Sequence, residues 1–346
     1  NIMMLRLSFQ RFRRFFDFSM PSLFGSFRVL RSFRRGREVF DMNVDISTEI
    51  AGVKFKNPII LSACPVSRDA FNCIRAIKAG IAGVVTKTLN REAAVNPMPA
   101  IAKIGDQMLV NAEKWSDLTY EDWLYKEIKE IKKYNVPVIA SIGLWVEDAE
   151  LITPLVADSG ADMIELVSYY DDQLVPMLKV ARKKTDLPIS VKVSANWRDV
   201  FKIAVKAEKE GADAITAIDS VGPVLAINVE KGEPYLGSET GEGWLSGTAI
   251  RPFAVRVVAG IAQRVKIPIF GVGGVASGKD IAEMVMAGAS AVQICTVLLF
   301  KGLKHIKVMQ EELKSFMERK GYSKLDDFRG LALKKIKRLI GEEEGH

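Results

Sequence analysis

Cysteine is scarce in this chain of 346 residues, which contains only Cys64, Cys73 and Cys295. The three lie far apart, and none belongs to a CxxC pair. An iron–sulfur cluster takes about four thiolates, and structural zinc takes clustered ligands. The sequence therefore predicts no metal site, and an odd, sparse cysteine count fits a reducing cytosol.

Histidine and long apolar runs are also in short supply. His305 falls in an expected final helix, and the other histidine, His346, is the last residue. A Ser–His or Cys–His catalytic pair needs a histidine beside the nucleophile, so we expect no such pair. No run of about 18 apolar residues occurs, which predicts a cytoplasmic protein without a membrane-spanning helix.

Excess charge is nearly absent after the first 41 residues. The formal net charge of the whole chain is +7. Residues 1–41 hold nine arginines, no lysine and three acidic residues, so 9 − 3 gives +6 there and leaves +1 for the rest. A nearly neutral body lacks the basic surface that nucleic acids require, so the sequence predicts no nucleic-acid partner.

The first 41 residues differ from the rest in composition as well as charge. Nine of the 17 phenylalanines lie there, interleaved with arginine as in Phe9–Phe18. We expect residues 1–41 to be a disordered N-terminal extension. Two alternatives stay open, namely a basic amphipathic segment resting on an anionic membrane and an Arg-rich targeting peptide.

Eight short apolar runs follow this extension. They are rich in Ile and Val and do not alternate with polar residues, as expected of strands buried on both faces. The runs are Pro58–Ser62, Ala82–Thr86, Pro137–Ile142, Met163–Val167, Ile189–Val193, Ala214–Ile218, Ile267–Gly271 and Ala291–Cys295. Before them, the alternating stretch Ile46–Phe55 predicts a hairpin of a size to plug the bottom of a barrel.

Amphipathic segments lie between the runs and predict helices, because their apolar residues recur at three- and four-residue spacing. The segments are Arg68–Ala79, Tyr120–Tyr134, Ala149–Ser159, Asp172–Lys184, Trp197–Glu210, Ala249–Arg264, Lys279–Ala287 and Leu303–Arg319. Several are followed by glycine, as at Gly160 and Gly288, which is a common helix stop before a strand.

These repeated strand–helix units predict an α/β fold, a (β/α)₈ TIM barrel over residues 42–330. Eight parallel strands with right-handed crossovers close readily into a barrel. A doubly wound open sheet is the competing fold. We expect residues 331–346 to form a C-terminal helix and a charged tail.

Two connections in this pattern are long. Residues Asn90–Thr119 follow the second expected strand, and Val221–Thr248 follow the sixth. Both come after strand C-terminal ends, where barrel active sites are built. We therefore expect these loops to be lids or walls of a pocket.

Glycine-rich turns end the last two expected strands. Gly271–Gly278 opens a helix, and Ala291–Thr296 ends the final strand. In barrels these two positions commonly form a phosphate cradle, because bare backbone N–H groups approach the oxygens closely. The alternative is that the glycines serve tight turns only.

Two lysines stand at strand ends, Lys87 after the second strand and Lys192 after the fifth. An inward-pointing lysine is costly unless an anion lies beside it. A reduced flavin carries negative charge on its N1–C2=O edge, and a fixed cation there stabilises it. A Schiff-base lysine and simple solvated lysines are the alternatives.

A series of motifs, taken together, resembles the dihydroorotate dehydrogenase family and follows that family's order. They are Asn57-Pro58, Ser62–Cys64, Val84–Thr88, Asn96–Pro99, Val191–Val193, Leu245–Gly247, Gly271–Gly274, Val292–Thr296 and Asp327–Gly330. The resemblance covers roughly Asn43 to Gly330. Asn111–Lys114 followed by Val138–Ile142 is more similar to the dihydropyrimidine dehydrogenase branch.

The resemblance implies an FMN-dependent oxidoreductase of pyrimidine metabolism that acts on a CH–CH or C=C bond. It also implies a homodimer and an electron-transfer partner subunit. Asn111 would bind the substrate, and Lys87 would reach both flavin and substrate. The implied cofactor-binding residues are Ser62, Ala63, Lys87, Thr88, Lys192, Gly247, Gly273, Gly274, Cys295 and Thr296.

The chain departs from the family motif that follows the fourth strand, Asn-x-Ser-Cys-Pro-Asn. Here Val167 stands for the first asparagine, Tyr170 for the acid/base cysteine and Asp172 for the last asparagine. Asp219 replaces another substrate asparagine after the sixth strand. We therefore predict that Tyr170, or alternatively Tyr169, acts as a proton donor beside Lys87.

The replacement of asparagines by Asp172 and Asp219 also changes which substrate charge the site would accept. Asp172 and Asp219 would meet an orotate carboxylate unfavourably, so a neutral or cationic substrate is expected. Two other functions stay open: a flavin-binding barrel without dehydrogenase activity, and a non-flavin phosphate-binding isomerase or synthase. Cys64, beside the expected flavin, is either a small apolar filler or a reactive thiol.

Overall fold

The computed structural model describes residues 44–340. The expected extension at residues 1–41 and the end of the charged tail, residues 341–346, lie outside the described residues. Within 44–340, none of the helices combines the length and the apolar character that a membrane crossing requires.

Eight parallel strands close into a barrel, which confirms the predicted fold and excludes the doubly wound sheet. The hydrogen-bonded order around the ring is β10-β15-β16-β3-β4-β7-β8-β9. The strands are β3 (Ile59–Leu61), β4 (Gly83–Val85), β7 (Val138–Ile142), β8 (Met163–Val167), β9 (Ile189–Val193), β10 (Ala214–Ala217), β15 (Ile269–Val272) and β16 (Ala291–Ile294). They lie within the predicted apolar runs or shift from them by one residue.

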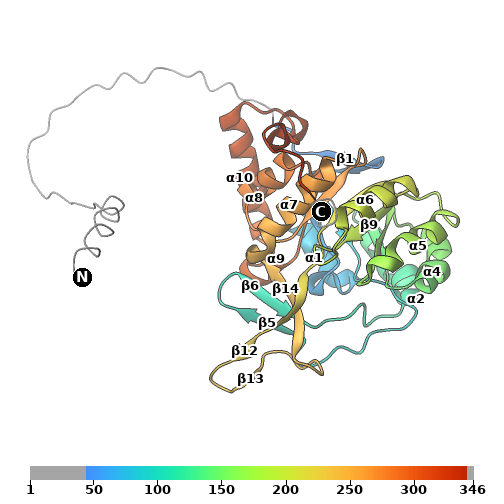
Figure 1. The fold of residues 1–346 in the computed structure, drawn as a ribbon. Coiled ribbons are helices and arrows are strands. Elements are labelled where there is room, and N and C mark those ends of the chain that lie inside the picture. Colours follow the sequence, from blue (N-terminus) through green and yellow to red (C-terminus); the bar gives the residue numbers. More distant parts are fainter. Residues whose placement is uncertain (1–43, 341–346) are drawn as a thin grey trace, which may run out of the picture. The chain divides into compact units, whose positions relative to one another are not determined.

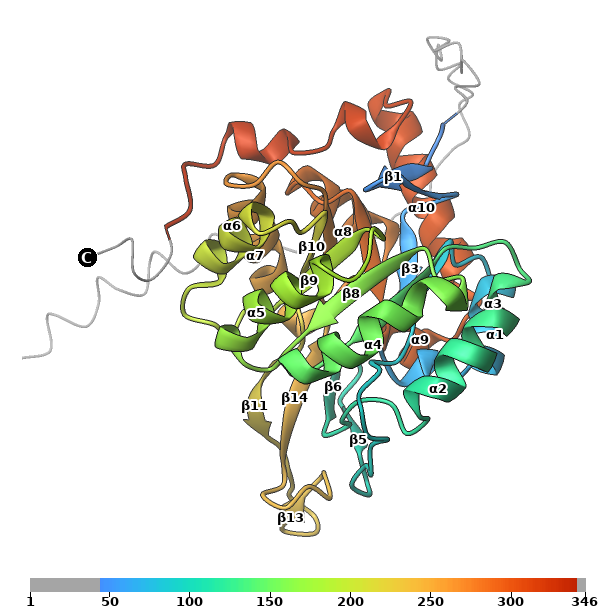
Figure 2. The ribbon, with the colours of Figure 1, turned by 90° about the vertical axis from the view of Figure 1, so that its right-hand side faces the viewer.

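Helices surround the barrel, as Figures 1 and 2 show. They are α1 (Ala70–Lys78), α2 (Tyr120–Asp122), the π-helical η2 (Trp123–Glu127), α3 (Ile128–Lys132), α4 (Val146–Ser159), α5 (Asp171–Arg182), α6 (Val200–Lys209), α7 (Arg251–Ala262), α8 (Gly278–Met286), α9 (Thr296–Lys301) and α10 (His305–Lys320). Gly160 ends α4 with φ +85°, so the left-handed stop predicted from the sequence is present.

Two predictions about the C-terminal part need correction. The sequence pattern missed α9, which starts directly after β16. The described part of the expected terminal helix contains only a 3₁₀ turn, η5 (Leu331–Lys334). Beyond it, the side chain of Gln263 donates to the backbone oxygens of Ile336 and Lys337 and accepts from Leu339 N–H. These backbone groups bond to the side chain of the residue that follows α7 instead of forming a helix.

The predicted hairpin is present as β1 (Thr48–Ile50) and β2 (Val53–Phe55). It lies at the end of the barrel opposite the long loops (Figures 1 and 2). Phe55 is 1% exposed and meets Phe270 of β15 edge to face at 6.3 Å. The hairpin therefore plugs the N-terminal end of the barrel with apolar side chains.

Truncating this plug should destabilise the whole domain. We expect Phe55→Ala to lower the free energy of unfolding by about 3–5 kcal/mol, because a buried aromatic ring is lost and a cavity remains. Urea unfolding checks this, with the exposed neighbour Lys54→Ala as the control. A Phe55→Ala variant as stable as the control would show that the plug contributes little.

The two long connections form one antiparallel sheet over the other end of the barrel. Its order is β11-β14-β6-β5, and its strands are β5 (Ile101–Ile104), β6 (Met108–Asn111), β11 (Val221–Leu225) and β14 (Glu242–Gly247). A smaller hairpin, β12 (Ile227–Asn228) and β13 (Glu233–Pro234), extends from it. The prediction that these loops wall a pocket is confirmed below.

Gly247 lies at a close approach of the two connections. Its φ is +99°, and a Cβ there would lie 2.0 Å from the backbone oxygen of Gln107. No other residue fits this conformation and this contact together. The glycine therefore fixes the distance between the end of β14 and the β5–β6 turn.

Candidate active site

A cavity of about 540 Å³ opens at the C-terminal end of the barrel, beneath the four-stranded sheet. This volume lies within the range of sites for small ligands and cofactors. Of the fourteen residues predicted from the sequence, twelve line it: Ser62, Ala63, Lys87, Thr88, Asn111, Lys192, Asp219, Gly247, Gly273, Gly274, Cys295 and Thr296. Tyr170 and Asp172 do not.

The first cation of the cavity comes from the end of β4. Lys87 Nζ donates to Glu113 Oε2 at 2.7 Å, and the two side chains are 10% and 18% exposed. Glu113 lies in the connection after β6 and also lines the cavity. The sequence analysis did not single out Glu113, and its pairing neutralises Lys87 within the site.

The second cation comes from β9. Lys192 Nζ lies 3.5 Å from Asp219 Oδ1, and its side chain is 6% exposed. Burial alone would lower the pKa of Lys192, but the carboxylates of Asp219 and Glu165 raise it above its ordinary value. The ammonium group therefore stays charged at the wall of the cavity.

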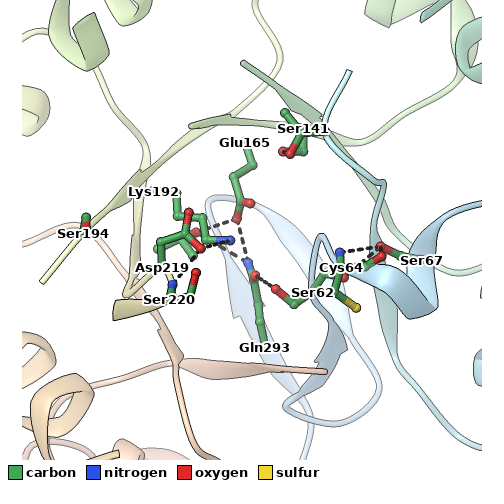
Figure 3. Close-up of polar contacts among 12 residues, drawn as sticks. Ser62, Cys64, Ser67, Ser141, Glu165, Lys192, Ser194, Asp219, Ser220 and Gln293 are labelled. Atoms are coloured by element: carbon green, nitrogen blue, oxygen red, sulfur yellow. Dashed lines mark hydrogen bonds and ion pairs between the residues drawn. The ribbon is translucent and has the colours of Figure 1, made fainter. Parts of the chain in front are cut away.

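A network of buried polar side chains spans the barrel interior beside Lys192 (Figure 3). Glu165, on β8, is fully buried; its Oε2 accepts from Gln293 Nε2 at 2.8 Å and from Thr216 Oγ1 at 2.9 Å. Gln293 Oε1 in turn accepts from Ser62 Oγ at 3.3 Å. Within the described chain, Glu165 Oε1 has no hydrogen-bond partner, so Lys192 is its main electrostatic compensation.

Glu165 was also missed, although the sequence carries a signal for it. It is the one charged residue in the apolar run Met163–Val167, and a buried carboxylate in a strand requires partners. Within β8, Glu165 and Val167 face the same side, as the strand period of two requires. Beyond the end of β8 at Val167, Ser168 and Tyr169 line the cavity and Tyr170 does not.

Of the two tyrosines named from the sequence, the structure places the alternative, Tyr169, in the cavity and Tyr170 outside it. Tyr169 lines the cavity and stacks on Trp244 at 5.7 Å between ring centroids. Tyr169 is 38% exposed, and the desolvation of its hydroxyl in the cavity, followed by the nearby charge of Asp219, raises the pKa of Tyr169 above its ordinary range. Its hydroxyl therefore remains protonated at neutral pH.

Tyr170 instead caps the N-terminus of α5 outside the cavity. It is 48% exposed and stacks on Trp145 at 4.7 Å. Its backbone N–H donates to Ser168 Oγ at 3.1 Å, and the helix starts at the next residue. Asp172 lies in the first turn of that helix and is exposed, so neither residue contacts the cavity in this arrangement.

The residues predicted to form a phosphate cradle line the cavity together. Gly273 and Gly274 directly follow β15, while Thr296 begins α9, whose first N–H groups have no acceptor within the helix. Thr296 Oγ1 lies 2.9 Å from Ser246 Oγ of β14. A Cβ on Gly274 would lie 2.7 Å from Arg251 Cβ, so glycine lets this loop pack against α7. Backbone donors and hydroxyls of this kind suit a phosphate group.

No metal centre accompanies these groups in the described part of the chain. Across residues 44–340, no three His, Cys, Asp or Glu side chains are placed to hold a metal ion. The two buried lysines of the cavity pair with carboxylates, Lys87 with Glu113 and Lys192 with Asp219. Its lining also includes Asp106, Lys114, Asp280 and Lys301, together with amides, hydroxyls and thiols. This donor set suits an organic cofactor with a phosphate tail.

Comparisons with known proteins agree with the site. A family model described as dihydroorotate dehydrogenase matches residues 45–317. The catalytic subunit of dihydroorotate dehydrogenase B (NAD(+)) from Pyrococcus abyssi is 31% identical over 306 residues, covering 84% of this chain and 99% of the relative. The subunits of the same name from Pyrococcus horikoshii and Methanothermobacter thermautotrophicus are each 32% identical over 305 residues. They cover 84% and 83% of this chain and 98% of each relative. The chain therefore belongs to the dihydroorotate dehydrogenase family and is a dihydroorotate dehydrogenase-like oxidoreductase.

Proposed function

We propose that this protein is an FMN-dependent dehydrogenase acting on the CH–CH or C=C bond of a small uncharged ring. The observation that carries the proposal is Lys192. It is a buried ammonium held in its charged form at the cavity wall by Asp219 and Glu165. Such a cation serves a partner that becomes anionic during the reaction.

The lining of the cavity fits FMN in its donor chemistry. Lys192 would face the N1–C2=O edge of the ring system, and Ser62, Ala63 and Thr88 would lie along the ring. Gly247, Gly273, Gly274, Cys295 and Thr296 would hold the phosphate through backbone and hydroxyl donors. When bound, FMN supplies the two-electron exchange with the substrate.

Tyr169 is the residue that we propose to move a proton. Its hydroxyl lies in the field of the Asp219 and Glu113 carboxylates, which keep it protonated. It faces the cavity, whereas Tyr170 does not. In alkene reduction, the Tyr169 O–H would give its proton to the carbon next to the one that accepts the hydride. Trp244, stacked on its ring, would hold that hydroxyl in place.

The charges of the cavity favour a substrate without a carboxylate. Both buried lysines are already paired, Lys87 with Glu113 and Lys192 with Asp219. An anionic substrate would have to displace one of these carboxylates or lie against it, at a cost of several kcal/mol. A cyclic amide such as a dihydropyrimidine avoids this cost. The similarity of Asn111–Lys114 to the dihydropyrimidine branch supports the same substrate class.

Electrons must also leave the flavin after each turnover. The three cysteines of this chain cannot supply the roughly four thiolates of an iron–sulfur cluster. The relatives named above are catalytic subunits. We propose that this chain likewise works with a second subunit that carries the electrons.

Anaerobic reduction of the bound flavin tests the substrate class. We expect 5,6-dihydrouracil to bleach the flavin at least about 100-fold faster than dihydroorotate, because the carboxylate of dihydroorotate meets Asp219 and Glu113. The variant Asp219→Asn, which frees Lys192, should narrow this difference. Faster bleaching by dihydroorotate in the unmodified protein would overturn the proposed substrate class but not the proposed cofactor.

A further inference from the structure

Side chains from the surrounding helices converge on the loop that follows β15. Residues 273–277 form this cradle loop, and all five line the cavity. The cradle loop ends at Ser277, whose hydroxyl caps α8 by accepting from the N–H of Asp280. α8 lies between α7 and α10 (Figure 1). The cradle loop can therefore be held from these three helices at once.

The peptide groups on both sides of Ala276 are held by side chains. The N–H of Ala276 donates to Asp280 Oδ2 at 2.9 Å, from the first turn of α8. The carbonyl oxygen of Ala276 lies 2.9 Å from His305 Nε2, at the start of α10. Because a carbonyl oxygen only accepts, this ring nitrogen carries the proton. Two consecutive peptide planes of the cradle loop are therefore fixed in direction.

The first N–H groups of α8 are occupied by acceptors from the protein itself. Gly278 N–H donates to Glu312 Oε2 at 2.7 Å, and Asp280 N–H donates to Ser277 Oγ at 3.2 Å. Since Ala276 N–H is bound to Asp280, none of these three donors is free for a phosphate. A phosphate in the cavity therefore depends on the glycine turn of the cradle loop and on the residues at the start of α9.

Asp280 brings a negative charge to this part of the cavity, and Arg251 offsets it. Asp280 is 7% exposed and lines the cavity. Its Oδ1 lies 2.8 Å from Arg251 Nη1, so each carboxylate oxygen has a partner. Arg251 Nε also lies 2.9 Å from Oε2 of Glu283, which does not line the cavity. By charge alone Asp280 would disfavour a bound phosphate, so any benefit to binding comes from its hold on the cradle loop.

We infer that Asp280 and His305 are positioning residues that make the site selective for a phosphorylated flavin over the unphosphorylated one. The inference rests on the proposed FMN function and assigns residues that act through the cradle loop. The hold on Ala276 fixes the chain directly after the glycine turn, which has φ +118° at Gly273 and +72° at Gly274. Backbone N–H groups that are already held in one arrangement bind an anion without first being ordered.

Titration of the flavin-stripped full chain with FMN and with riboflavin tests the inference. The ratio of the riboflavin Kd to the FMN Kd measures what the phosphate contributes to binding. We expect Asp280→Ala to lower this ratio about tenfold or more, because a hydrogen bond to a charged acceptor is lost. The Kd of riboflavin should stay within about twofold, since riboflavin has no phosphate to place in the cradle. Asp280→Asn keeps an oxygen for the Ala276 N–H and should restore most of the ratio. His305→Ala should lower the ratio more than His305→Gln, which keeps a donor.

Glu283→Gln is the matched control, because it removes the other carboxylate on Arg251 without touching the cradle loop. Its ratio should equal that of the unmodified protein, and circular dichroism confirms that each variant is folded. An Asp280→Ala protein that loses FMN and riboflavin affinity equally would show a structural role only, and an unchanged ratio would show no role in positioning. Either result overturns the inference and leaves the proposed cofactor in place. An unmodified protein that binds neither flavin would overturn the proposed function, and the inference with it.

Discussion

Replacing Tyr169 by phenylalanine should lower turnover by about 10²–10⁴-fold, the usual contribution of a general acid. The substitution removes only the hydroxyl, so the ring should keep its stacking on Trp244. Flavin content and substrate binding should therefore change little. Stopped-flow measurement of the half-reaction between flavin and substrate isolates the affected step.

Tyr170→Phe is the matched control for this substitution. Tyr170 is the adjacent residue, is also stacked on a tryptophan and lies outside the cavity. We expect its turnover to match that of the unmodified protein. If Tyr170→Phe were the slow variant and Tyr169→Phe the normal one, the assignment from the sequence motif would be right and the one from the geometry wrong.

Replacing Lys192 by methionine should strongly lower both the free energy of unfolding and the reduction potential of the bound flavin. The variant leaves the fully buried Glu165 and its neighbour Asp219 without their cation. Removing one partner of a buried ion pair costs about 3–5 kcal/mol. We expect a loss of this size in the free energy of unfolding, together with a lower flavin reduction potential.

A second variant separates the two consequences of losing Lys192. The double variant Lys192→Met with Glu165→Gln removes the buried charge as well, so it should recover most of the stability but not the activity. Exposed Lys183→Met is the control and should change neither. A Lys192→Met protein with unchanged stability and unchanged flavin potential would contradict the role given to this lysine.

The pKa of Lys192 also predicts how stability depends on pH. Its folded pKa is raised above the unfolded value. The stabilisation is therefore fully present below the unfolded pKa, about 10.4, and disappears as the pH rises through the folded pKa. Lys192→Met should lack this alkaline component in urea unfolding.

The barrel could be predicted from the sequence because strands buried on both faces leave continuous apolar runs such as Met163–Val167. Most of the predicted site residues line the cavity, since strand ends in a closed barrel meet at one mouth. The residues that the long connections contribute to the site could not be predicted in the same way. Pairs such as Lys87–Glu113 depend on how those connections fold over the barrel.

The position of the two tyrosines relative to the cavity could not be predicted from the sequence motif. The motif placed the acid/base by counting positions in a loop, which gave Tyr170. Which tyrosine enters the cavity depends on the path of the short loop between the end of β8 at Val167 and the start of α5 at Asp171, and counting positions does not give that path. The predicted terminal helix is not formed in the described residues because the side chain of Gln263, directly after α7, bonds to the backbone groups of the tail.

Thermal unfolding of the purified protein with and without FMN tests the central claim most directly. The account predicts a yellow protein whose cofactor-stripped form gains about 2.7 kcal/mol of stability when FMN is present at a hundred times its Kd. Its Tm should rise by several degrees, and riboflavin, which lacks the phosphate, should raise it less. A colourless protein with the same Tm in FMN as in buffer would contradict the claim that Lys192 and the glycine cradle hold this cofactor.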